Sequence, residues 1–219
     1  MIFTLFKDIC FEVTEPETLI ESYCFQSNFY SKYDFDRPNG DERYHRVRFI
    51  GARIKEDVVK KCRSRISEYG SYLSTIDERG LDWLLEKATV DERNSFISNL
   101  SELTHRLDDI PLVGLSRATN ILHTRFPEVI PMVDNPLQKE YKKLRKEWRK
   151  GDWHQMLFKD YYDNLLEKST SDNLQELHER LSYLNLTKVR IFDILWWSLL
   201  KSESREYKKI EWKTIRRIH

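Results

Sequence analysis

Apolar side chains recur along most of the chain at intervals of three and four residues, which is the pattern of one buried face of an α-helix. Between residues 56 and 69, for example, Val58, Cys62 and Ile66 follow this spacing. The same pattern predicts helices over residues 81–107, in two parts divided near 89–91, and over residues 115–123, 137–148, 174–184 and 187–200. We therefore expect a mainly α fold.

The strand-like stretches lie near the N-terminus, at residues 2–13 and 46–54. They predict a small β element in that part of the chain. We expect residues 1–50 to form an accessory segment and residues 51–219 to form a helical domain. The two parts are expected to pack as one compact unit.

A loop is predicted over residues 29–43, because the sequence PNGD at residues 38–41 consists of turn-forming residues. Tyr33 and Asp34 lie in this loop, and side chains of these types can stack on a ligand and orient it. The alternative is that the loop packs its own aromatic side chains onto the body of the protein. Tyr33 and Asp34 are therefore candidate pocket residues.

The overall charge does not identify a partner. The chain has 37 Lys and Arg residues against 36 Asp and Glu, so the formal net charge is +1. Charge is nevertheless concentrated locally, with seven basic and two acidic residues over 139–150, and seven basic and three acidic residues over 201–219. Each stretch is either a solvated helix face or a rim that binds an anion.

Several classes of protein are disfavoured by what the sequence lacks. No apolar run approaches the ~20 residues that span a bilayer, and the N-terminal residues do not have the pattern of a secretion signal. The three Cys and the isolated His residues show no metal-ligand spacing. We expect a cytoplasmic protein with no membrane partner, no metal and no cofactor, while the oligomeric state stays undetermined.

A motif at residues 110–120 suggests a binding site. Pro111 and Gly114 define a short turn between two predicted helices. Such a turn exposes successive backbone N–H groups at a helix N-terminus, where they can hold a phosphate with help from the helix dipole. Twenty positions after Gly114, Asp134 stands at the start of another predicted helix, directly before Asn-Pro.

Together, the turn and the acid resemble the helix-hairpin-helix DNA glycosylase superfamily, which includes endonuclease III and the adenine glycosylases. The superfamily hairpin reads like L-P-G-V-G-x-K/S-T-A, and V-D-T-H follows it at the mouth of the active site. The residues that match are Pro111, Val113, Gly114 and Ala118 in the hairpin and Val133-Asp134 at the acid. The chain departs from the pattern at Leu112, which replaces a Gly, and at Asn135-Pro136, which replace Thr-His.

The resemblance implies a helix-hairpin-helix glycosylase-like fold and duplex DNA as the partner. It implies that the hairpin binds a backbone phosphate and that nearby basic side chains attract the duplex. The implied DNA-binding residues are Leu112, Val113, Gly114, Leu115, Ser116, Arg117, Lys139, Lys142 and Lys143.

Asp134 would be the catalytic acid group of a DNA-repair enzyme that excises a base flipped out of the duplex. Ser116 takes the position where bifunctional members carry a Schiff-base Lys, so the resemblance implies a monofunctional glycosylase without lyase activity. The alternative for Asp134 is simple N-capping of the helix that follows, which requires no substrate. The target base is not determined by the sequence.

Two other interpretations stay open. The chain is either a non-catalytic helix-hairpin-helix module that binds nucleic acid, or a helical interaction or regulatory protein in which the hairpin is only a core turn. Asp193 lies on an otherwise apolar helix, so it needs a partner if it is buried, and it is a third candidate pocket residue. A looser similarity, carried by Tyr33-Asp34 and residues 118–123, 131–134 and 192–196, is to an uncharacterised bacterial domain family and implies no function.

Overall fold

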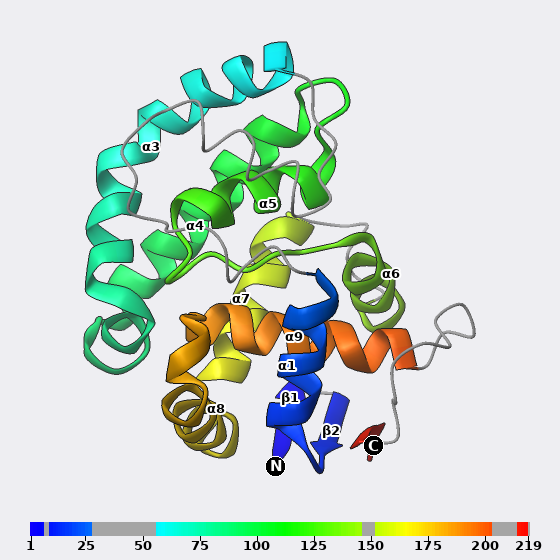
Figure 1. Ribbon diagram of the computed structural model, residues 1–219. Helices are drawn as coiled ribbons and strands as arrows, with labels where there is room; N and C mark the ends of the chain where they lie inside the picture. The colour runs from blue at the N-terminus through cyan, green and yellow to red at the C-terminus, as the bar shows by residue number, and fades with distance from the viewer. Residues whose placement is uncertain (7–8, 28–55, 146–151, 203–213, 219) are drawn as a thin grey trace.

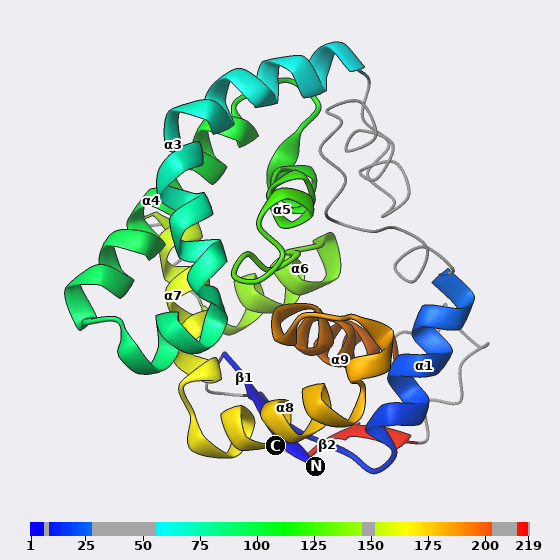
Figure 2. The same cartoon turned by 60° about the vertical axis from the view of Figure 1, so that its left-hand side comes forward.

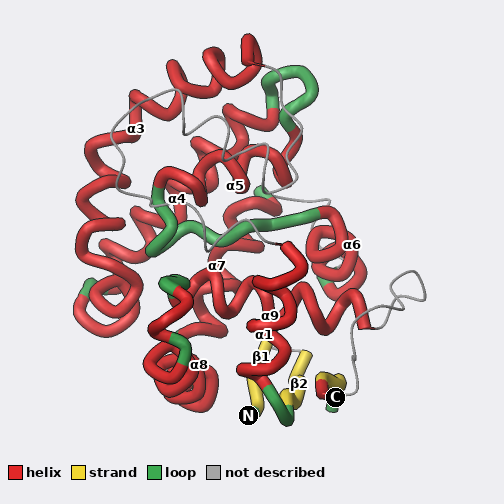
Figure 3. Tube along the Cα trace, in the orientation of Figure 1, coloured by secondary structure: helices red, strands yellow, loops and turns green. Residues whose placement is uncertain are grey.

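The computed structural model describes residues 1–6, 9–27, 56–145, 152–202 and 214–218. The fold is mainly α-helical with a small antiparallel sheet, as the spacing of apolar residues predicted (Figures 1 and 3). Within these ranges, every helix is too short or too polar to span a lipid bilayer.

The elements of the described residues, in chain order, are β1 (Ile2–Leu5), β2 (Ile9–Val13), α1 (Pro16–Ser27), α3 (Glu56–Asp82), the π-helical turn η1 (Trp83–Lys87), α4 (Val90–Asp108), α5 (Gly114–Arg125), α6 (Asn135–Leu144), α7 (Trp153–Leu165), α8 (Lys168–Arg180), the 3-10 turn η3 (Ser182–Leu184), α9 (Lys188–Ser202) and β3 (Ile215–Arg217).

Helix α9 runs through the middle of the molecule and contacts α1, α6, α8 and β3 (Figures 1 and 2). Its side chains are buried on nearly all sides, which explains why its sequence is the most apolar of the helices. Helix α4 contacts α3, α5 and α7 in the other half of the molecule. The two helices α4 and α5 thus pack against each other across the short turn at residues 109–113.

The sheet has the strand order β1-β2-β3, with both pairs antiparallel. Phe3 of β1 is paired with Phe11 of β2, and their buried rings stack with centroids 5.6 Å apart. Strand β3 was not predicted, because its three residues lie in the basic stretch 201–219 and show no strand-like pattern of their own. Arg216 of β3 instead forms an ion pair with Glu12 of β2 at 2.6 Å. The strand predicted at residues 46–54 lies outside the described residues.

The boundary between the two helical parts predicted near residues 89–91 is confirmed. Thr89 is the N-cap of α4 in a capping box: the Glu92 backbone N–H donates to the Thr89 hydroxyl at 3.2 Å, and the Thr89 N–H donates to the Glu92 carboxylate at 2.8 Å. The helix expected from the apolar spacing at residues 56–69 is longer than predicted. Helix α3 runs from Glu56 to Asp82, across a kink at Gly80, whose φ is 78°.

Other helices differ from the prediction at their ends. Helix α6 begins at Asn135 and ends at Leu144, so it stops short of the predicted residue 148, and α8 begins at Lys168 rather than at residue 174. Helices α1 and α7 were not predicted at all.

Candidate functional site

The turn between α4 and α5 forms the first part of the candidate site. Within residues 109–113, the Val113 N–H donates to the Ile110 carbonyl at 3.0 Å. Leu112 and Gly114 both have left-handed backbone conformations, with φ of 74° and 63°. Val113 is the N-cap of α5 and makes no side-chain capping bond, and the first turn of α5 contains no acidic residue. The first amide groups of α5 therefore have neither a partner within the helix nor a side-chain cap.

Side chains on both sides of the turn determine its shape and charge. The Arg117 guanidinium donates a hydrogen bond back to the carbonyl of Leu112. On the other side, a Cβ atom at Gly114 would lie 3.9 Å from Oδ1 of Asp108. An anion at this turn would therefore lie near the Arg117 guanidinium and the Asp108 carboxylate, and Asp109, an exposed residue of the turn itself, is a second acidic side chain there.

A series of close contacts connects the turn to α6. Oδ2 of Asp108 lies 3.8 Å from Nε2 of His154, which is buried. The His154 ring centroid is 4.4 Å from that of Trp153, and Nζ of Lys142 is 4.1 Å from the Trp153 centroid. These contacts link Lys142 to the turn through Trp153, whose indole is partly exposed, and through the buried His154.

The other basic residues of the stretch 139–150 differ in their exposure and in their ion pairs. Lys139 is exposed, and Lys143 is exposed but lies 3.1 Å from the Glu140 carboxylate. Glu140 also pairs with Arg217 of β3 at 3.0 Å. Residues 146–150, the second half of the basic stretch, lie outside the described residues.

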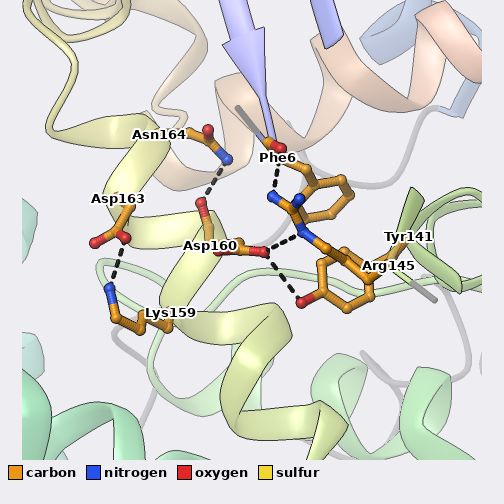
Figure 4. A network of polar contacts seen from close by, with 7 residues as sticks. All are labelled: Phe6, Tyr141, Arg145, Lys159, Asp160, Asp163 and Asn164. Carbon is orange, nitrogen blue, oxygen red and sulfur yellow. Dashed lines mark hydrogen bonds and ion pairs between the residues drawn. The ribbon is translucent and has the colours of Figure 1, made fainter. Parts of the chain in front are cut away.

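Arg145 has an internal role although it belongs to the same basic stretch (Figure 4). Its guanidinium donates to the Asp160 carboxylate at 2.9 Å and to the carbonyl of Phe6 at 2.9 Å. The Tyr141 hydroxyl donates to the same Asp160 oxygen at 3.1 Å. This network joins the C-terminal end of α6 to α7 and to the end of β1, and it fixes the direction in which the basic face of α6 points.

Asp134 is the N-cap of α6, as the capping interpretation predicted. Its Oδ1 accepts a hydrogen bond from the Leu137 N–H at 3.1 Å. Burial raises the pKa of Asp134, and the Leu137 amide, Lys201 and the Trp197 indole each oppose part of this rise. The carboxyl group therefore has a definite structural function, and the same geometry places it against basic and aromatic side chains of α9.

The segment that leads to Asp134, residues 126–134, begins with a turn at residues 127–129 and then runs without helix or strand to the start of α6 (Figure 3). Two carboxylates accept hydrogen bonds from its backbone. Asp77 of α3 accepts from the Glu128 N–H at 2.9 Å, and Asp193 of α9 accepts from the Met132 N–H at 2.8 Å. Burial raises the pKa of each of these two carboxyl groups to about 7.

Side chains of α5 and α7, and that of Thr187 directly before α9, hold the same segment at further points. The contacts are Val133 N–H to the Thr119 hydroxyl at 3.0 Å, His123 Nδ1 to the Ile130 carbonyl at 2.6 Å, the Tyr162 hydroxyl to the Val129 carbonyl at 2.5 Å, and the Thr187 hydroxyl to the Pro127 carbonyl at 2.9 Å. Burial lowers the pKa of His123 to about 3, so its imidazole is neutral at pH 7. The position of Asp134 is therefore set by four different helices.

Asp193 lies in the core, with only 1% of its surface exposed. In addition to the Met132 amide, its carboxylate accepts from the Tyr161 hydroxyl at 3.0 Å and from the Trp196 indole N–H at 3.2 Å. The structure thus supplies the partners that a buried Asp needs, and gives Asp193 a structural role. A role in a ligand pocket stays a prediction.

A group of side chains beside Asp134 was not selected from the sequence. The Arg190 guanidinium donates to the Tyr23 hydroxyl at 2.9 Å, and the Tyr23 ring meets the Trp197 ring edge-on at 5.2 Å. Lys201 lies over the same Trp197 ring, at 5.6 Å from its centroid. The spacing 190, 197 and 201 along α9 is helical and could have indicated this shared face, but nothing in the sequence connects it to Tyr23 of α1.

Tyr33 and Asp34, the other two candidate pocket residues, lie outside the described residues. In the part of the chain that the structure does describe, no cluster of three or more His, Cys, Asp or Glu residues is arranged to hold a metal ion.

Comparison with known proteins gives one result. A family model described as a family of unknown function (DUF6308) matches residues 47–200, which is more than half of the chain. The matched region contains the hairpin, the segment 126–134, Asp134 and most of α9. No curated protein matches the chain, and no solved structure matches it.

Proposed function

We propose that this chain, which belongs to the DUF6308 family of unknown function, binds duplex DNA by holding a backbone phosphate at the turn between α4 and α5. The observation that carries the proposal is the backbone of this turn. Leu112 and Gly114 are both left-handed, and α5 then begins without a capping side chain or an acidic first turn. Uncapped amides at a helix N-terminus favour an anion through their hydrogen atoms and through the helix dipole.

The surroundings of the turn suit a polyanion. Arg117 lies within the first turn of α5, and Lys142 is linked to the turn through Trp153, His154 and Asp108. Such cations supply the sequence-independent attraction that dominates the affinity of proteins for DNA. Asp108 opposes this attraction, since its carboxylate lies next to Gly114. Replacing Asp108 by Asn is therefore expected to strengthen DNA binding.

The decisive variant is Ser116→Asp, because it should raise the folding stability of the protein and lower its affinity for DNA. An acidic residue in the first turn of α5 stabilises the helix through its dipole, by about 0.3–1 kcal/mol. The same carboxylate would repel a phosphate from the amides of that turn. Ser169→Asp, in the exposed first turn of α8, is the matched control because it adds the same charge to the N-terminus of another helix.

The test is a fluorescence-anisotropy titration with duplex DNA at two salt concentrations. We expect the wild-type affinity to fall with salt, Ser116→Asp to weaken binding roughly tenfold or more, and Ser169→Asp to change it less than twofold. Equal binding by wild type and Ser116→Asp would contradict the use of the hairpin. No binding to any duplex at moderate salt would refute the proposal and favour the helical interaction protein.

A second candidate function, monofunctional base excision by Asp134, is favoured by one observation. The Asp134 carboxyl, whose pKa is raised by burial, lies against Trp197 and Lys201, with Arg190 close enough to affect its charge. An aromatic ring, a carboxylate and cations are the groups that a flipped nucleotide requires for stacking, for stabilising positive charge on the sugar, and for holding its phosphate.

Asp134→Asn tests the catalytic role without removing the helix cap, because Asn caps helices about as well as Asp. The substrates are duplexes that each carry one oxidised, deaminated or alkylated base, and the readout is strand cleavage by alkali after incubation. We expect wild-type protein to form alkali-labile sites but no direct nicks, because residue 116 is not a Lys. Excision that persists unchanged in Asp134→Asn would exclude this role, and DNA binding without any excision would leave the non-catalytic module.

A further inference from the structure

His154 is a buried imidazole that the proposed binding of DNA does not use. Only 1% of its surface is exposed, and within the described part of the chain neither ring nitrogen makes a hydrogen bond. A buried polar group without a hydrogen bond lowers folding stability, so native proteins contain few of them. A phenyl ring would fill a similar space without this cost. Packing alone therefore does not account for a His at this position.

The charged and titratable side chains that act on His154 come from three helices. His105 and Asp108 lie on α4, Asp152 is the N-cap of α7, and Lys142 lies on α6. Burial lowers the pKa of His154, the two carboxylates oppose this fall, and His105 and Lys142 add to it. Because burial is the largest effect, the imidazole is neutral at pH 7 and takes up a proton only in acid solution.

Asp108 is the carboxylate that a protonated His154 can engage. The two oxygens of Asp152 already accept hydrogen bonds, Oδ1 from two amides at the start of α7 at 3.1 and 3.2 Å, and Oδ2 from the Ser101 hydroxyl at 3.0 Å. Oδ2 of Asp108 lies 3.8 Å from Nε2 of His154, which is within ion-pair distance but longer than a hydrogen bond. A positively charged N–H group at Nε2 would close this gap, because a buried charge needs a partner.

The same carboxylate faces the turn between α4 and α5. Asp108 is the last residue of α4, and its Oδ1 lies 3.9 Å from the position of a Cβ atom built on Gly114. One oxygen of the carboxylate is therefore directed at the imidazole and the other at the start of α5. While His154 is neutral, the negative charge of Asp108 acts on an anion at the start of α5. An imidazolium bound to Oδ2 would cancel that charge.

We propose that His154 and Asp108 form a pH switch, in which the protonated imidazole pairs with the carboxylate in acid solution, cancels its charge at the turn and strengthens DNA binding there. The inference rests on the proposed phosphate site and adds the condition that regulates it. At neutral pH the carboxylate repels a phosphate at the start of α5. Cancelling one unit charge about 7 Å from a phosphate in water changes the affinity roughly threefold, and more where water is excluded.

The first measurement is a fluorescence-anisotropy titration with undamaged duplex DNA, at constant ionic strength and at several pH values from about 5 to 8. His154→Phe keeps a ring in the core and removes the titration, while Asp108→Asn removes the charge and keeps the size of the side chain. The matched control is His105→Asn, which removes an exposed His whose ring centroid lies 5.7 Å from that of His154.

We expect wild type and His105→Asn to gain about threefold or more in affinity between neutral and acid pH, beyond any gain shown by His154→Phe. Asp108→Asn should bind more tightly than wild type at neutral pH and should gain little more in acid. A second measurement detects the pair without DNA, by NMR titration of the His154 ring and of the amides of residues 109–115. We expect these amide signals to shift together with the His154 ring in wild type and not in Asp108→Asn.

The outcomes separate the switch from the proposed function. An equal gain in wild type and His154→Phe, or a gain that persists in Asp108→Asn, overturns the switch, while weaker binding by Ser116→Asp would still support the phosphate site. Amide signals that do not follow the His154 ring in wild type also overturn it, because the imidazolium would then not pair with Asp108. If wild type binds no duplex at any pH, the phosphate site fails, and the switch fails with it because it has no site to regulate.

Discussion

Replacing Asp193 by Asn tests whether burial or hydrogen bonding determines the protonation of this carboxyl group, which binds the segment leading to Asp134. Three donors, from Met132, Tyr161 and Trp196, point at this carboxylate and favour its ionised form. Burial favours the neutral form and is the larger effect, so the pKa of Asp193 is raised from 3.8 to about 7. The substitution removes the titration and keeps the size of the side chain.

The raised pKa makes the contribution of Asp193 to stability depend on pH. Between the unfolded pKa of 3.8 and the folded pKa of about 7, the folded protein holds a proton that the unfolded chain has lost. Stability from this group is therefore complete below pH 4 and is lost as the pH rises through 7. The difference of about 3 pKa units corresponds to a total on the order of 4 kcal/mol, and the part between pH 5 and 8 to about 3 kcal/mol.

The measurement is denaturant unfolding of wild type and Asp193→Asn at several pH values from 5 to 8. Titration of all other groups cancels in the difference between the two proteins. We expect the stability of wild type relative to the variant to fall by about 3 kcal/mol over this range. Asp91→Asn, which removes a carboxylate from an exposed position in the first turn of α4, is the control for the loss of one charge. A constant difference for Asp193→Asn would refute the reasoning, because it would mean that the three donors and Arg190 keep Asp193 ionised throughout.

Two further predictions concern the helices that frame the site. Thr89→Ala removes the capping box of α4 and should lower the free energy of unfolding by about 1 kcal/mol in a denaturant titration, whereas an unchanged midpoint would show that the cap is not needed. Arg145→Met leaves the Asp160 carboxylate and the Phe6 carbonyl without their charged donor and should lower the free energy of unfolding by about 1–3 kcal/mol (Figure 4). The control is Lys159→Met, which breaks a more exposed ion pair and should lower it by less than about 0.5 kcal/mol. Equal losses in the two variants would contradict the special role of Arg145.

The sequence predicted the elements whose own residues carry the signal. Helix α5 and the start of α6 were predicted because their apolar spacing and their capping residues are local. Helices α1 and α7 were missed because several of their buried side chains are Tyr, Cys or His, which contribute less to an apolar pattern than Leu or Ile. Strand β3 is only three residues long, and it is stabilised by β2, which is about 200 positions away.

The candidate site was predictable to a smaller extent. The motif selected Gly114, which is left-handed at the start of α5, and Asp134, which caps α6. Tyr23 and Arg190 come together only through the packing of α1 on α9. The left-handed conformation of Leu112 could not have been deduced from residue preferences, because these preferences disfavour it. It is the surrounding turn, with Arg117 bonded to its carbonyl, that imposes the conformation.

The pairing of β2 with β3 also has a consequence for synthesis of the protein on the ribosome. Glu12 and Arg216, which face each other across this pair, are 204 positions apart. At about 5–20 residues per second, β2 would wait roughly ten seconds or longer before its partner exists. During that time its outer edge would present unpaired backbone groups that invite pairing with other nascent chains. The last described strand of the protein thus covers the outer edge of β2, and a chain truncated before Thr214 would leave that edge exposed.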